Sequence, residues 1–181
     1  MGALRDLKDN PFELLLQFEE RVRAAKLDIV AGQAQFWVGL GFRMDVRWLV
    51  TPRDEVREVI TMPTLARVPG ARPWLLGVAN VRGGLLPVCD LRRLVGGDHQ
   101  PLTRNSRVLV YNSDRIPAGF LVDEVAGYRQ FVPGEQRPEL IPEAGLFQPY
   151  SLGAFVRDGQ AWYALSLHKL VQSDTFKHSG F

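Results

Sequence analysis

The sequence predicts a mainly β protein made of two similar small barrels, with one helix ahead of them. Three observations support this fold class. From about residue 35 onward the chain is a series of short β-branched or aromatic runs, most of them bounded by Gly, Pro, Asn or Asp. Two polar or proline-rich stretches, residues 96–106 and 133–149, interrupt these runs, and a segment from the middle of the chain recurs near its end. Such spacing is typical of sandwiches and small barrels rather than of parallel sheets with crossover helices.

The expected helix occupies roughly residues 10–25. Asn10 suits its cap, Pro11 suits its first position, and Glu13 follows the cap by three residues. Apolar residues then recur at helical spacing with charged residues between them. We assign residues 1–34 to this N-terminal helical extension and expect the helix to pack on one lobe.

Ten strands are expected after the helix, each of them short. Because a closed barrel leaves no long free edge, barrels suit strands of this length. The expected ranges are 35–44, 48–50, 55–60, 75–81, 84–89, 107–111, 116–122, 128–131, 152–156 and 162–165.

An internal repeat divides these strands into two groups. Residues 77–95 recur as residues 153–171, with Gly77 matching Gly153 and Leu91 matching Leu167 at the same separation. In each copy a strand leads to a glycine turn and a second strand, and an Asp or Ser then caps a short helical turn. We therefore expect one domain over residues 35–172, with lobe one at about 35–100, lobe two at about 101–172, and a C-terminal tail at 173–181.

Composition narrows the classes of function. Hydrophobic residues make up 46% of the 181 residues, enough for a sizeable core, and a net charge of +2 gives no bulk reason to expect nucleic acid. The single cysteine cannot form a disulfide within the chain or a cysteine metal cluster, and it suits a reducing compartment. The N-terminus has no apolar signal core and no run is long enough to span a bilayer, so we expect a cytoplasmic protein without membrane insertion.

No residue pattern predicts catalysis, a metal or a cofactor. Residues 39–44 open like a dinucleotide-binding loop but lack the third glycine and a following βαβ unit. His99, His168 and His178 have none of the spacings typical of zinc sites. Cys89 lies in an apolar strand and suits a small core residue better than a nucleophile. Two rival functions stay open, a nucleic-acid-binding β-barrel and a cysteine-dependent hydrolase.

Arg82 fits none of these patterns. It lies at the bend of an otherwise apolar hairpin, directly before the glycine pair of the turn. An arginine on a rigid turn loses little entropy when it pairs, and its planar fork suits a carboxylate or a carbonyl. Because arginine is also enriched at interface hot spots, we interpret Arg82 as a binding residue.

At this hairpin the sequence resembles the CheW-type chemotaxis adaptors. Residues 67–96, "RVPGARPWLLGVANVRGGLLPVCDLRRLVG", are similar to the central signature of that family. Residues 54–60, 118–127 and 150–171 resemble three further segments of it in the same order, so the resemblance covers residues 35–172. The opening "NPFELLLQFEERVRA" and "GVANVRG" are most similar to the PilI branch, which serves type IV pilus chemosensory systems and twitching motility.

The resemblance implies two five-stranded β-barrels with a groove between them, the first strand being shared with the second lobe. It implies a non-catalytic adaptor, without a cofactor, that couples the cytoplasmic tips of chemoreceptors to the regulatory domain of a CheA-type histidine kinase at membrane-associated receptor arrays. We hypothesise that an apolar cleft lined by Val56 and Gly77 accepts a helical receptor tip, with Gly77 permitting close approach. Arg82 would supply polar register and Glu58 a complementary charge. The receptor-binding residues expected here are Val56, Glu58, Gly77, Asn80 and Arg82.

Overall fold

The computed structural model describes residues 36–99 and 101–177. The chain divides into two units, Met1–Phe36 and Trp37–Phe181, and the fold described below belongs to the second. The expected N-terminal helix, in residues 10–25 of the extension 1–34, lies outside the described residues.

All ten expected strands are present. The largest difference lies in the eighth strand, which begins at Glu124 rather than at Tyr128. The strands are β1 (Trp37–Met44), β2 (Arg47–Pro52), β3 (Val56–Thr61), β4 (Leu75–Val81), β5 (Gly84–Asp90), β6 (Arg107–Tyr111), β7 (Gly119–Val122), β8 (Glu124–Phe131), β9 (Ser151–Arg157) and β10 (Gln160–Leu165).

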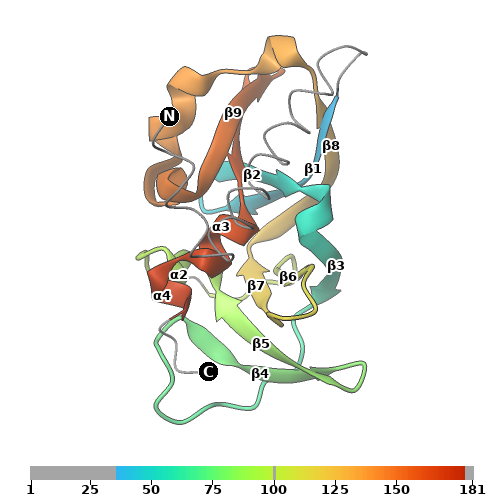
Figure 1. Ribbon diagram of the computed structural model, residues 1–181, viewed down its shortest axis with the longest axis vertical. Coiled ribbons are helices and arrows are strands. Elements are labelled where there is room, and N and C mark those ends of the chain that lie inside the picture. The colour runs from blue at the N-terminus through green and yellow to red at the C-terminus, as the bar shows by residue number, and fades with distance from the viewer. Residues whose placement is uncertain (1–35, 100, 178–181) are drawn as a thin grey trace, which may run out of the picture. The chain divides into compact units, whose positions relative to one another are not determined.

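The strands form two five-stranded sheets. Sheet A has the order β8-β1-β2-β10-β9, and sheet B has the order β3-β6-β7-β5-β4 (Figure 1). Each sheet contains one parallel pair, β2 with β10 in sheet A and β5 with β7 in sheet B, and its other neighbours are antiparallel. The mainly β fold with two similar lobes is therefore confirmed.

The two sheets divide the chain differently from the lobes expected on either side of residue 100. Sheet B takes the five consecutive strands β3 to β7, whereas sheet A combines β1 and β2 with β8 to β10. The parallel pairing of β2 with β10 is the physical reason, because it joins strands that a cut at residue 100 would separate. The resemblance implied that only the first strand is shared with the second lobe, but both β1 and β2 belong to it.

Neither sheet closes into a complete barrel, so that part of the expectation is corrected. The edge strands of each sheet do not pair with each other along their length. Instead, one isolated bridge links the segment after one edge strand to the other edge strand. Ala66, after β3, bridges to Val78 of β4, and Gln136, after β8, bridges to Phe155 of β9. Two backbone hydrogen bonds of 2.9 Å hold the first of these bridges.

Short helical turns follow the second strand of each repeated hairpin, as expected. Asp90 caps α2 (Leu91–Leu94) by accepting from the backbone N–H groups of Arg92 and Arg93. Ser166 caps α3 (Leu167–Gln172) by accepting from the N–H of Lys169. A further turn, α4 (Asp174–Lys177), lies in the segment that the sequence left as a tail.

Three 3₁₀ segments complete the described fold. The segment η3 (Arg53–Glu55) connects sheet A to sheet B, and η4 (Pro133–Glu135) follows β8. The proline-rich excursion forms η5 (Pro138–Tyr150), which packs on β9 and β10 and buries Ala144 and Phe147.

One apolar core spans both sheets. Leu40 and Phe42 of β1, Leu109 of β6 and Phe120 of β7 belong to it, together with residues of α2 and α3. A second cluster lies within sheet B around Val88 and Val108, and a third, largely aromatic cluster lies within sheet A. The members of the third cluster are Val50, Phe131, Phe155, Trp162 and Ala164, with Trp37, Trp48 and Ala126 packed against them.

Candidate interaction site

The tip of the β4–β5 hairpin is a tight turn with an unusual occupant. Arg82 and Gly83 both have positive φ angles, 52° and 81°, as a two-residue type I′ turn requires. Asn80 accepts a hydrogen bond from the Gly83 N–H at its Oδ1, 3.0 Å away, and so holds the turn. Left-handed backbone favours Gly, Asn and Asp, so Arg82 occupies a position that its residue type does not favour.

Arg82 forms an ion pair with Glu58. Its Nη2 donates to Glu58 Oε2 over 2.7 Å, from the hairpin tip to strand β3 at the opposite edge of sheet B. The Arg82 side chain remains 80% exposed, whereas that of Glu58 is 22% exposed. Since an ion pair open to water contributes about 1 kcal/mol or less, the pair orients Arg82 more than it stabilises the fold.

Gly77 and Val56 lie inside the protein. Gly77 is buried and has a φ of 151°, next to a bulge between β4 and β5. A Cβ there would lie 2.6 Å from the carbonyl oxygen of Ala66, so Gly77 makes room for its own chain. Val56 is 7% exposed and belongs to the core between the sheets. Neither residue offers a surface to another protein in this structure.

Two exposed apolar residues near these positions were missed by sequence reasoning. Leu85 is 72% exposed and pairs directly with Asn80 across the hairpin, so both side chains lie on one face. Val59 of β3 is also exposed. The alternation along β5 was the available signal for Leu85, because a buried Leu86 requires its neighbour to point outward.

Cys89 is placed as a core residue. The thiol is buried, and burial together with the charge of Asp90 raises its pKa to about 12. A thiol so far from ionisation is a poor nucleophile at neutral pH. The two described histidines have other partners. His99 Nδ1 lies 2.5 Å from Asp90 Oδ2, and His168 Nδ1 lies 2.8 Å from the hydroxyl of Tyr111.

Neither a metal site nor a membrane-spanning helix emerges from residues 36–99 and 101–177. Within these ranges, His, Cys, Asp and Glu side chains nowhere gather in threes that could hold an ion. The helices in the same ranges are all too short or too polar to cross a bilayer. His178, the third histidine of the sequence, lies outside the described residues.

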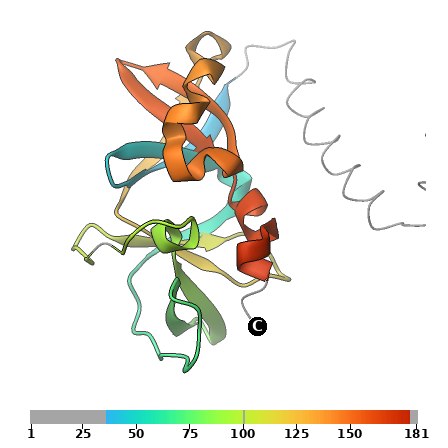
Figure 2. The same ribbon diagram turned by 90° about the vertical axis from the view of Figure 1, so that its left-hand side faces the viewer.

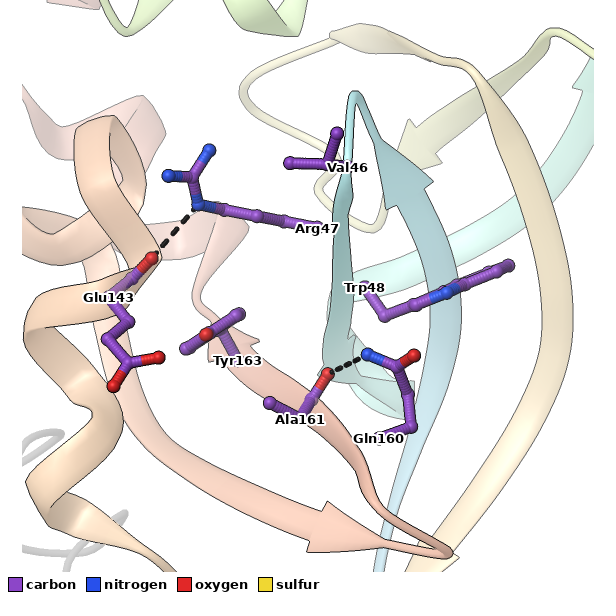
Figure 3. Close-up of a pocket in the computed structure, with 7 residues that line it drawn as sticks. All are labelled: Val46, Arg47, Trp48, Glu143, Gln160, Ala161 and Tyr163. Atoms are coloured by element: carbon purple, nitrogen blue, oxygen red, sulfur yellow. Dashed lines mark hydrogen bonds between the residues drawn. The ribbon is translucent and has the colours of Figure 1, made fainter.

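An open pocket of about 430 Å³ lies away from the hairpin, between sheet A and η5 (Figure 3). Arg47 reaches across it and donates from Nε to the carbonyl oxygen of Glu143 over 2.9 Å. Tyr163 also lines the pocket. Burial raises its pKa, and the nearby charge of Glu143 raises it further. The remaining lining residues are Val46, Trp48, Gln160 and Ala161, so the pocket contains neither a cysteine nor a histidine.

Comparison with known proteins agrees with the resemblance seen in the sequence. The family model described as the CheW-like domain matches residues 38–175. Protein PilI of Pseudomonas aeruginosa is 40% identical over 173 residues, covering 94% of each chain. The chemotaxis protein CheW of Thermotoga maritima is 28% identical over 76% of this chain and 89% of its own.

A solved structure supports the fold. The scaffolding protein TtCheW from Thermoanaerobacter tengcongensis superposes with a TM-score of 0.66 at 20% identity, over 76% of this chain and 94% of that one. The two-sheet architecture, the family model and the relatives lead to the same conclusion: this chain belongs to the CheW-like family of chemosensory adaptors.

Proposed function

We propose that this protein is a non-catalytic adaptor that couples chemoreceptors to a CheA-type histidine kinase. Its similarity to protein PilI over nearly the whole chain supports a place in the chemosensory system of type IV pili, which controls twitching motility. The protein would act in the cytoplasm and be recruited to membrane-associated receptor arrays.

Arg82 carries the proposal for the receptor contact. Its backbone has a φ of 52°, a conformation that costs an ordinary side chain about 1–2 kcal/mol, and its side chain projects into solvent. Glycine, asparagine or aspartate would form the same turn with less strain. A strained, exposed arginine that contributes little to the fold is best explained by a contact outside the fold.

The hairpin surface, defined as Glu58, Asn80, Arg82 and Leu85, has the chemistry of a small protein interface. Leu85 supplies exposed apolar area, and Arg82 supplies a fixed cation. Because a guanidinium has five N–H donors, Arg82 can hold Glu58 and also bind a carboxylate of a partner. A helical receptor tip that presents an apolar side chain beside an acidic one would fit this surface.

The kinase contact belongs on a different surface, because an adaptor must hold receptor and kinase at the same time. A regulatory domain that is itself CheW-like would present similar sheet edges, and related edges can pack in a pseudo-symmetric manner.

The alternative of a nucleic-acid-binding barrel is less well supported. Several of the described arginines pair with carboxylates rather than forming a basic stripe. These pairs are Arg43 with Glu124, Arg57 with Asp114, Arg82 with Glu58, and Arg157 with Glu135.

A charge-reversal experiment tests the receptor contact. Arg82→Asp should weaken the binding of a receptor-tip fragment by about 1–3 kcal/mol, or roughly fivefold to 150-fold, because it removes the cation and repels Glu58. Affinity is measured by calorimetry and folding by circular dichroism. The matched control is Asp158→Arg, which reverses the charge at the tip of the other hairpin. Unchanged receptor affinity in Arg82→Asp, with a folded protein, would remove Arg82 from the interface.

A further inference from the structure

We propose that residues 166–177 form a clasp that holds sheet A and sheet B in their relative position. The segment begins at the end of β10, in sheet A, and its side chains contact sheet B. In Figures 1 and 2, α3 and α4, drawn in red, run from the end of sheet A toward sheet B. Two separate anchors, one polar and one aromatic, attach the clasp.

The polar anchor joins α3 to the connection between the sheets. Glu55 lies in η3, where the chain passes from β2 to β3, and is 3% exposed. Its carboxylate accepts from Ser166 Oγ over 2.9 Å and from the backbone N–H of His168 over 3.1 Å. The imidazole of His168 in turn meets the hydroxyl of Tyr111 on β6 of sheet B.

The aromatic anchor joins α4 to sheet B. The ring of Phe176 stacks on Trp74, with centroids 5.8 Å apart and an interplanar angle of 16°. It also lies 6.2 Å from the ring of Phe120 on β7. Trp74 and Phe120 are both buried, and Phe176 packs against the core that both sheets share. Lifting α4 would therefore uncover an aromatic site on sheet B.

Besides the core that both sheets share, two short crossings of the chain connect the sheets. The chain crosses from sheet A to sheet B through η3, between Pro52 and Val56, and returns between Val122 and Glu124. Only a few residues separate the strands at each crossing, so the crossings add little resistance to a rotation of one sheet against the other, which the shared core and residues 166–177 must then oppose. A clasp that starts on one sheet and is anchored on the other restrains such a rotation.

The reactivity of Cys89 can be used to measure how often the clasp opens. It is the single cysteine of the sequence, it lies opposite Phe120 on the neighbouring strand, and it is 1% exposed. A buried thiol with a pKa of about 12 reacts with an alkylating reagent only when the structure around it opens. Its alkylation rate under native conditions therefore measures how often the region beneath the clasp opens.

The test is native-state alkylation of Cys89 in the full chain, without receptor or kinase, so its outcome is independent of the adaptor proposal. Phe176→Ala removes the aromatic anchor, and Tyr111→Phe removes only the hydroxyl of the polar anchor. The control is Val50→Ala, which opens a cavity inside the aromatic cluster of sheet A, a cluster that contains no residue of the clasp. Urea unfolding gives the global stability of each variant.

We expect Phe176→Ala to accelerate labelling by about tenfold or more beyond what its loss of global stability explains, and Tyr111→Phe to do so by a smaller factor. Val50→Ala should change labelling only in proportion to its global stability. If the labelling rates of all three variants follow global stability alone, residues 166–177 are an ordinary part of the core and the clasp is overturned. If Phe176→Ala does not fold, the labelling rates of Tyr111→Phe and Val50→Ala, compared at their measured stabilities, still decide whether residues 166–177 form a clasp.

Discussion

The β4–β5 and β9–β10 hairpins are two copies of one structural element, and they differ at the tip. Both turns have two positive φ angles, 52° and 81° at Arg82 and Gly83, and 51° and 75° at Asp158 and Gly159. Aspartate tolerates left-handed backbone and arginine does so poorly. The second tip is therefore explained by the turn alone, whereas the first carries a residue that the turn does not require.

The ion pairs beside the two hairpins also differ, because one is held within the fold and the other is largely exposed. Arg157 binds both carboxylate oxygens of Glu135, at 2.7 and 3.1 Å, and its guanidinium lies 5.3 Å from the ring centroid of Phe131. Glu135 also accepts from the N–H of Val132 over 2.8 Å. This pair is tied into the fold at both ends, whereas the Arg82–Glu58 pair leaves its arginine in solvent. The β9–β10 ion pair is thus part of the fold, whereas Arg82, the proposed binding residue, stays exposed at the tip of β4–β5.

The largest expected effect on stability comes from substituting the glycine in the first strand of each hairpin, Gly77 in β4 and Gly153 in β9. Gly77→Ala should lower the free energy of unfolding by about 3 kcal/mol, because the new Cβ would meet the Ala66 carbonyl and the φ of 151° suits glycine alone. Gly153 is its counterpart in the second copy, and a Cβ there meets nothing within 4 Å. Gly153→Ala should therefore be nearly neutral in urea unfolding. Equal losses in the two variants would show that Gly77 has no special packing role.

Ten strands could be predicted from the sequence because their information is local. Alternation and Gly or Pro boundaries appear within each run. The division into sheets could not, because the parallel pairing of β2 with β10 and the two edge bridges join segments far apart in the chain. The turn α4 was missed because Phe176 is its one large apolar residue and its partner Trp74 is distant in sequence.

For the same reason, only part of the geometry of the candidate site could be predicted from the sequence. The position of Arg82 at a glycine turn is visible in the sequence, and the structure places it at an exposed tip. Its pairing with Glu58 and the burial of Val56 depend on how the edges of sheet B approach each other. Gly77 does permit a close approach, but the atom that approaches belongs to Ala66 of the same chain.

A smaller effect is expected from neutralising the two glutamates of the ion pairs. Burial alone would raise the pKa of Glu135, but the Val132 N–H and Arg157 outweigh it and hold this pKa below its usual range. A carboxyl with a lowered pKa stabilises the fold above the pKa of the unfolded chain, and this stabilisation is lost as the pH falls through the folded pKa. Glu135→Gln should cost about 1 kcal/mol at pH 7, and its difference from the unmodified protein should disappear in acid.

Glu58→Gln is the matched variant in the first copy. Because its arginine partner is largely in solvent, we expect a stability change within about 0.5 kcal/mol together with weaker receptor binding. Urea unfolding across a range of pH values, with receptor affinity at pH 7, checks both variants. A larger stability loss in Glu58→Gln than in Glu135→Gln would reverse the assignment of structural and binding hairpins.

The smallest expected effect on stability gives the sharpest test of the difference between the two hairpins. Arg82→Asn supplies a residue that prefers left-handed backbone but removes the ion pair with Glu58, and these two changes oppose each other. We therefore expect the free energy of unfolding to change by less than about 0.5 kcal/mol, as we also expect for Asp158→Asn. Only Arg82→Asn should weaken receptor binding. If it instead destabilised the fold by well over 1 kcal/mol, the ion pair of Arg82 would be structural, like that of Arg157 in the second hairpin, and the two hairpins would no longer differ in role.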